Sequence, residues 1–130
     1  MSLNVSDGLV RQAAWGTLDA GDFADTIRQS LPYAWGIVES LAERVYEGGE
    51  TWADHAIPPP SEQARGQLLR MVGGDAIRRM VEQHFDVKLA FQNCHRLAAF
   101  RPDAVNSGAY LDFISVRNQS MNQTPELVDC

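Results

Sequence analysis

The chain has 130 residues, of which 45% are hydrophobic and 22% are charged, and its formal net charge is −6. This length and composition fit one globular domain, residues 1–130, and exclude the low hydrophobicity of disordered proteins. An acidic protein lacks the long-range attraction that dominates non-specific binding to phosphate backbones, so we expect no nucleic-acid partner.

The location of the protein follows from what its sequence lacks. No run of apolar residues approaches the roughly 18 that a membrane-spanning helix needs. The N-terminus lacks the basic-then-apolar pattern of a secretory signal. We therefore expect a soluble cytoplasmic protein that does not contact membranes.

Residues 23–47 carry the strongest helical signal. Their apolar residues recur in steps of four and three, and Gly48-Gly49 follows as a natural helix end. Pro32 lies inside the pattern and cannot donate the helical hydrogen bond to residue 28, so we expect a kink or a break there.

The middle of the chain begins with a proline-rich stretch. Residues 51–60 contain three consecutive prolines, which favour an extended backbone, and we predict an irregular connection. Ser61 is a suitable N-cap for the next helix, Gly73-Gly74 ends that helix, and another helix starts at Asp75.

The segment 84–100, HFDVKLAFQNCHRLAAF, fits two periods. Residues 85–91 alternate as in a half-buried strand, whereas the longer window from Asp75 repeats its apolar residues at three and four. A strand needs a partner, and the rest of the chain barely offers one. We therefore favour one long helix over residues 75–101, with a strand over 84–92 as the open alternative.

A helix over residues 75–101 would bring four candidate ligand-binding residues close to one line on its apolar side: His84, Lys88, Phe91 and His95. Lys88 is the only lysine in the chain. A desolvated amine beside imidazoles can bind an anion. The two histidines would lie about 16 Å apart along the helix, too far to share one metal ion. The plain alternative is that all four are ordinary members of a helix core.

Spacings typical of catalysis or metal binding are missing. Neighbouring helical residues point about 100° apart, so Cys94 and His95 are poorly placed to act on each other. Cys94 then serves as a small hydrophobic residue. We expect no metal and no cofactor, and the sequence identifies no catalytic residue.

The predicted fold is an all-α bundle of four to six helices, of which 23–47 and 75–101 are long, with a polar C-terminal tail over 118–130. Its charge is segregated, because residues 1–64 hold three arginines against ten acids, whereas residues 65–101 hold seven basic residues against three acids. Such complementarity suits contacts within one chain or between two copies.

Two functions remain open. The first is a non-enzymatic interaction or accessory protein that forms a homodimer and meets a protein partner. The alternative is a small-molecule binder or small enzyme, in which the histidines and the lysine named above line a pocket for an anionic ligand.

Overall fold

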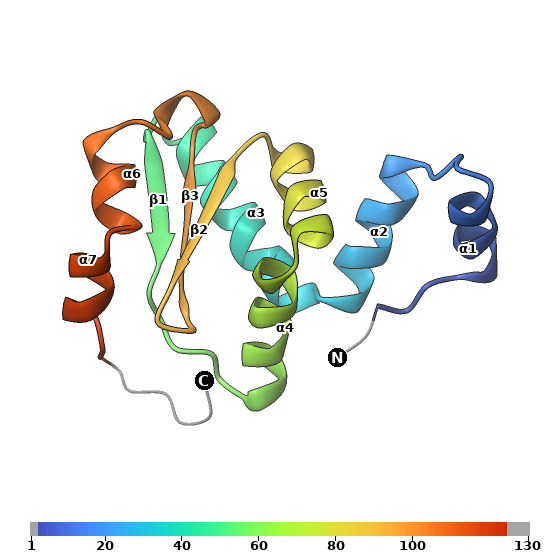
Figure 1. Cartoon of the computed structure of the whole chain (residues 1–130), viewed down its shortest axis with the longest axis horizontal. Helices are drawn as coiled ribbons and strands as arrows, with labels where there is room; N and C mark the ends of the chain where they lie inside the picture. The colour runs from blue at the N-terminus through green and yellow to red at the C-terminus, as the bar shows by residue number, and fades with distance from the viewer. Residues whose placement is uncertain (1–2, 125–130) are drawn as a thin grey trace.

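The computed structural model describes residues 3–124, which form seven α-helices and a three-stranded antiparallel sheet (Figure 1). In chain order the elements are α1 (Asp7–Ala14), α2 (Ala20–Ser30), α3 (Pro32–Tyr46), β1 (Trp52–His55), α4 (Glu62–Gly73), α5 (Asp75–Phe85), β2 (Lys88–Gln92), β3 (Arg96–Phe100), a short 3-10 helix (Pro102–Ala104), α6 (Gly108–Phe113) and α7 (Val116–Met121). The all-α prediction is therefore wrong, and the protein is mixed α/β.

The sheet has the strand order β1-β3-β2, so β3 is central and the other two strands are edges. The hairpin of β2 and β3 pairs Gln92 with Arg96 at its closed end and Lys88 with Phe100 at its open end. β1 adds to the other side of β3, with Trp52 opposite Phe100. β1 and β2 each run antiparallel to β3 and hence parallel to each other.

The predicted helix over 75–101 is wrong beyond residue 85. α5 ends where Asp86 takes a left-handed backbone conformation, with a φ of 54°. The hairpin turn that follows holds two more residues with positive φ, Asn93 and Cys94. The alternation over 85–91 was the stronger signal, because β3 directly after it supplied the partner strand.

Of the other predicted boundaries, two are confirmed and one is wrong in part. The break at Pro32 is confirmed, since Pro32 is the first residue of α3. Ser61 caps α4, its hydroxyl accepting from the Ala64 N–H at 3.1 Å. The irregular connection over 51–60 is wrong in part, because β1 lies within it. α7 extends into the predicted tail 118–130, whose residues 125–130 lie outside the described part.

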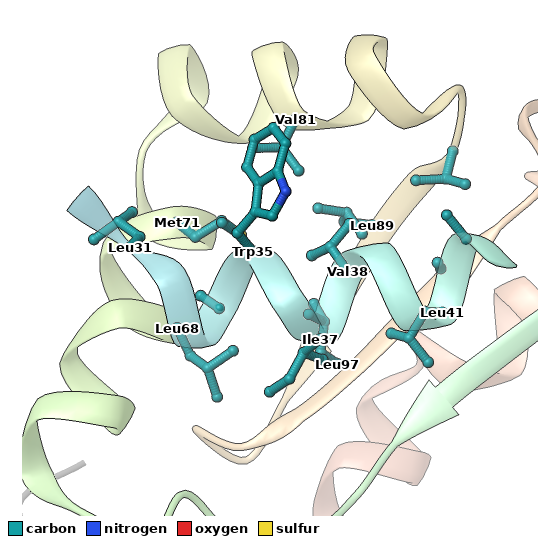
Figure 2. Close-up of a cluster of buried hydrophobic side chains, with 14 of the residues drawn as sticks. Leu31, Trp35, Ile37, Val38, Leu41, Leu68, Met71, Val81, Leu89 and Leu97 are labelled. Carbon is teal, nitrogen blue, oxygen red and sulfur yellow. The ribbon is translucent and has the colours of Figure 1, made fainter. Parts of the chain in front are cut away.

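The main core lies between one face of the sheet and helices α2 to α5. α3 runs through it and buries one face at helical spacing. Figure 2 shows these side chains converging: Leu31, Trp35, Ile37, Val38, Leu41, Leu68, Met71, Val81, Leu89 and Leu97.

A second, smaller core covers the opposite face of the sheet. It consists of Ala90, Ala98, Phe100 and Phe113, with Trp52 and Tyr110 packed against it. Strand residues alternate between the two faces, so Leu89 faces the main core whereas Ala90 faces the smaller one. α6 supplies two of the rings in this core and is thereby held against the sheet.

The N-terminal helices extend from the body of the molecule (Figure 1). Leu9 is the one buried residue of α1, and Trp15 directly after that helix is 82% exposed. None of the helices within residues 3–124 is long and apolar enough to cross a membrane.

Candidate binding groove along strand β2

The four predicted ligand-binding residues do not form one site. His84 is on α5, where its ring lies 5.0 Å from that of Trp35. Lys88 and Phe91 are on β2, and His95 is buried in the β2–β3 turn. The line that joined the four residues depended on a continuous helix, so the structure keeps only Lys88 and Phe91 together.

Lys88 and Phe91 line a cavity of about 240 Å³ that we call the β2 groove. Its walls come from the end of α4, from α5, from β2 and from α6. The lining residues are Val72, Arg78, Lys88, Leu89, Ala90, Phe91, Tyr110 and Ile114. The groove therefore follows the β2 edge of the sheet, between the face that carries the main core and the face that carries the smaller core.

The edge of β2 turns backbone groups away from the sheet. The Leu89 N–H turns away from β3, since it donates to the Glu82 carboxylate at 2.8 Å. Outward-facing backbone groups recur at every second residue of an antiparallel strand, so Phe91 also turns its N–H and C=O outward. Within residues 3–124, β3 is the only strand that pairs with β2.

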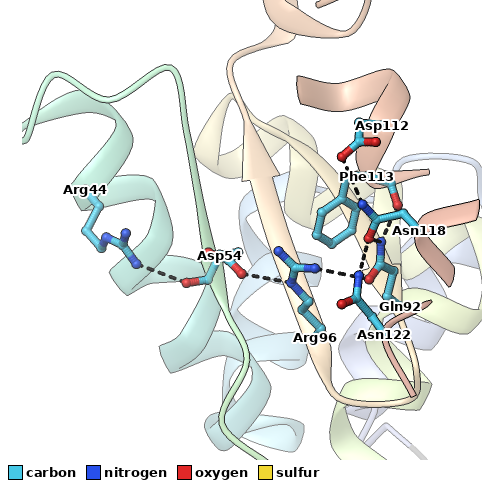
Figure 3. Close-up of polar contacts among 8 residues, drawn as sticks. All are labelled: Arg44, Asp54, Gln92, Arg96, Asp112, Phe113, Asn118 and Asn122. Carbon is cyan, nitrogen blue, oxygen red and sulfur yellow. Dashed lines mark hydrogen bonds and ion pairs between the residues drawn. The ribbon is translucent and has the colours of Figure 1, made fainter. Parts of the chain in front are cut away.

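The opposite edge of the sheet is covered. Arg44 on α3 donates from Nη1 to the Asp54 carbonyl of β1 at 3.0 Å. Figure 3 shows this contact at the outer side of β1. A side chain on such a position hinders the addition of another strand, so β2 is the more accessible edge.

Charged groups in the β2 groove are largely neutralised. The Lys88 Nζ lies 3.5 Å and the Arg78 Nε 3.7 Å from the Glu82 carboxylate. Arg78 also pairs with Asp75 at 2.9 Å. Two cations thus meet two carboxylates, and the groove has no large surplus of positive charge.

A polar cluster fixes α6 and α7 beside the groove (Figure 3). Gln92 at the end of β2 donates to the Phe113 carbonyl and, at 3.0 Å, to the Asn118 side chain. Asn118 in turn donates to Asp112 at 2.9 Å. These bonds tie β2 to the two helices, and Ile114 on the groove wall lies between them.

The β3 side of this cluster holds the strands together. Arg96 bonds Asp54 of β1 at 2.9 Å and Gln92 of β2 at 3.3 Å, and its guanidinium lies 4.8 Å from the Phe113 ring centre. Arg96 also lines a separate hollow of about 250 Å³, together with His95. His95 therefore belongs to a different surface from Lys88.

The pKa of His55 on β1 is lowered from its ordinary value. Burial lowers its pKa, the Asp54 carboxylate opposes this by favouring the charged form, and His95 adds to the lowering. The His55 Nε2 is buried and has no hydrogen-bond partner among the described residues. Within residues 3–124 no three His, Cys, Asp or Glu residues are grouped to hold a metal ion.

Sequence reasoning missed most of the groove. Arg78, Tyr110 and Ile114 carried no signal of their own, since each looked like an ordinary residue of a helix. The usable signal was the alternation over 85–91, which marks a strand and hence a sheet edge. A strand over these residues places Lys88 apart from both His84 and His95.

Together the fold and the groove define a small mixed α/β protein with an accessible sheet edge. A family model described as NucS shadow ORF matches residues 1–130, so the chain belongs to that family. The short name of the model also carries the letters KH. Comparisons with curated proteins and with solved structures give no match.

Proposed function

We propose that this protein is a non-enzymatic interaction module that binds an extended peptide segment of a protein partner along β2. The observation that carries the proposal is the outward-facing backbone of Phe91 inside the β2 groove. Proteins commonly recognise extended peptides by adding them as a strand to such an edge. Main-chain hydrogen bonds then supply affinity, and pockets for alternate side chains supply specificity.

The walls of the β2 groove suit a peptide with apolar side chains. Phe91 and Tyr110 are partly buried and offer ring surface, whereas Ile114 is 52% exposed. Leu111, one turn before Ile114 on α6, is 53% exposed but does not line the groove. Apolar side chains left in contact with water at one site commonly mark an interaction surface.

A second candidate is single-stranded nucleic acid. The letters KH in the family model's name and the order β1–α4–α5–β2, with Gly73-Gly74 between the helices, favour it. KH modules clamp four nucleotides with a Gly-x-x-Gly loop. Here the turn reads Val-Gly-Gly-Asp, so an acidic residue, Asp75, stands at the loop.

The charges of the groove favour the peptide over the nucleic acid. Both cations on its walls already have carboxylate partners, and the chain as a whole carries −6. Nucleic-acid binding draws most of its affinity from unneutralised cations that meet phosphates. A peptide needs no such surplus.

The homodimer remains a separate proposal. The segregation of acidic and basic residues supports it. Sedimentation equilibrium that finds only a monomeric species at micromolar concentration would contradict self-association.

The peptide proposal is tested with a displayed library of random peptides selected on the immobilised protein. Binding of the selected peptides is then measured by fluorescence anisotropy for the wild type and two variants. Ile114→Glu places a charge on the groove wall and should abolish binding. Leu111→Glu introduces the same charge one turn earlier, at an equally exposed position outside the groove, and should leave binding intact.

Two results would overturn the proposal. One is equal loss or equal retention of binding in both variants. The other is the absence of any selected peptide, together with oligonucleotide binding that falls steeply with salt and is lost in Lys88→Met. That second result would favour the nucleic-acid candidate.

A further inference from the structure

The Glu82 side chain stands in a site built for a carboxylate. Its Oε2 accepts the Leu89 N–H at 2.8 Å and lies 3.5 Å from the Lys88 Nζ, and its Oε1 lies 3.7 Å from the Arg78 Nε. A backbone donor on a sheet edge and two cations thus converge on one anionic group. Only 12% of the Glu82 side chain is exposed.

We infer that these three donors form a carboxylate subsite of the β2 groove, and that an acidic side chain of the partner peptide replaces Glu82 in it. The inference rests on the proposed peptide binding and names the chemistry of the segment. The partner is therefore an extended segment with an Asp or Glu beside apolar residues.

The subsite can be reached from the groove. Arg78, Lys88 and Leu89 all line the groove, and the Lys88 side chain is 40% exposed. Glu82 comes from α5 on a flexible side chain, so it can turn into water without a change in the sheet. Exchange of one carboxylate for another keeps both cations paired.

The exchange also explains why a neutral segment would bind less well. The partner's carboxylate takes the Leu89 N–H while its main chain pairs with Phe91, and this removes the hydrogen bond to Glu82. Lys88 then lacks a carboxylate close to the strand unless the peptide brings one. In the unbound protein, Glu82 covers the edge and limits unspecific strand addition.

Acetate is the probe for the subsite, used on the full chain with Glu82→Ala. Acetate should bind saturably in the vacated space and return the Leu89 amide resonance toward its wild-type position in 15N NMR spectra. Chloride at the same ionic strength should not do so. The double variant Glu82→Ala with Lys88→Met should bind acetate about tenfold more weakly, because a charge-assisted contact is lost.

A second variant keeps the test decisive if Glu82→Ala fails to fold. Glu82→Gln retains the side-chain volume and an oxygen for the Leu89 N–H, but leaves Lys88 without its carboxylate and Arg78 with Asp75 alone. Selected peptides should bind Glu82→Gln about tenfold more tightly than wild type. Their Asp→Asn or Glu→Gln versions should lose this gain.

The outcomes separate the two proposals. If acetate acts no better than chloride, or if neutral peptide versions bind as tightly as acidic ones, the subsite is refuted, while peptide binding itself can stand. If acetate binds as expected but no peptide does, the proposed function fails and the inference about its partner fails with it.

Discussion

Phe100→Ala tests whether the second face of the sheet is a true core. Phe100 is fully buried and stacks on Trp52 at 5.2 Å, with Tyr110 and Phe113 rings at 5.1 and 5.9 Å. A buried Phe→Ala change costs about 3–5 kcal/mol of unfolding free energy, and three ring contacts place this site toward the upper end. Small proteins have only about 5–15 kcal/mol in total.

Urea denaturation followed by circular dichroism measures the effect. We expect the unfolding midpoint to fall sharply and the melting temperature to drop by roughly 10–20 °C. Leu111→Ala is the control, because Leu111 lies on α6 but points into solvent, and it should change the unfolding free energy by less than about 0.5 kcal/mol. A loss below about 1 kcal/mol for Phe100→Ala would refute the packing of α6 against the sheet.

Three other sites give predictions from local contacts. Ser61→Ala removes the cap of α4 and should cost about 1 kcal/mol of unfolding free energy, measured by urea titration. Asp54→Ala leaves Arg96 without its 2.9 Å partner, and because the side chains are 28% and 23% exposed the cost should be about 1–2 kcal/mol. The folded-state pKa of His55 is lowered below 6.5, so the folded protein binds fewer protons than the unfolded chain, and stability should fall as pH drops below about 6.5. Melting temperatures from pH 5 to pH 8 should show this slope in the wild type and a flatter one in His55→Gln, and an unchanged slope would contradict the assignment.

The first half of the fold could be predicted from the sequence because its signals are local. The apolar spacing of α3, the break at Pro32 and the Ser61 cap depend on neighbours in the chain. The sheet depends on distant pairing instead. β1 has only four residues, Trp52–His55, and lies close to three prolines. Nothing in its local sequence indicates that it pairs with residues 97–100.

Most of the candidate site could not be predicted from the sequence, for a related reason. In a strand Lys88 and Phe91 face opposite sides of the sheet, and both line the groove because it lies along the edge of β2, so they were found on a wrong premise. Their actual neighbours Tyr110 and Ile114 lie some twenty residues away and reach the groove only because Gln92 and Phe100 hold α6 against the sheet. Contacts between distant segments of this kind produce no periodic pattern in the sequence.

The most direct test of the account is a 15N NMR titration of the protein with a selected peptide. Binding along the β2 edge predicts the largest shifts at the amides of Leu89 and Phe91, with smaller ones at Ile114, and slowed hydrogen exchange of the Phe91 amide. The amides of β1, whose edge Arg44 covers, should stay unchanged. Shifts centred on β1 or on α1, with Leu89 and Phe91 unaffected, would contradict the proposal that β2 is the binding edge.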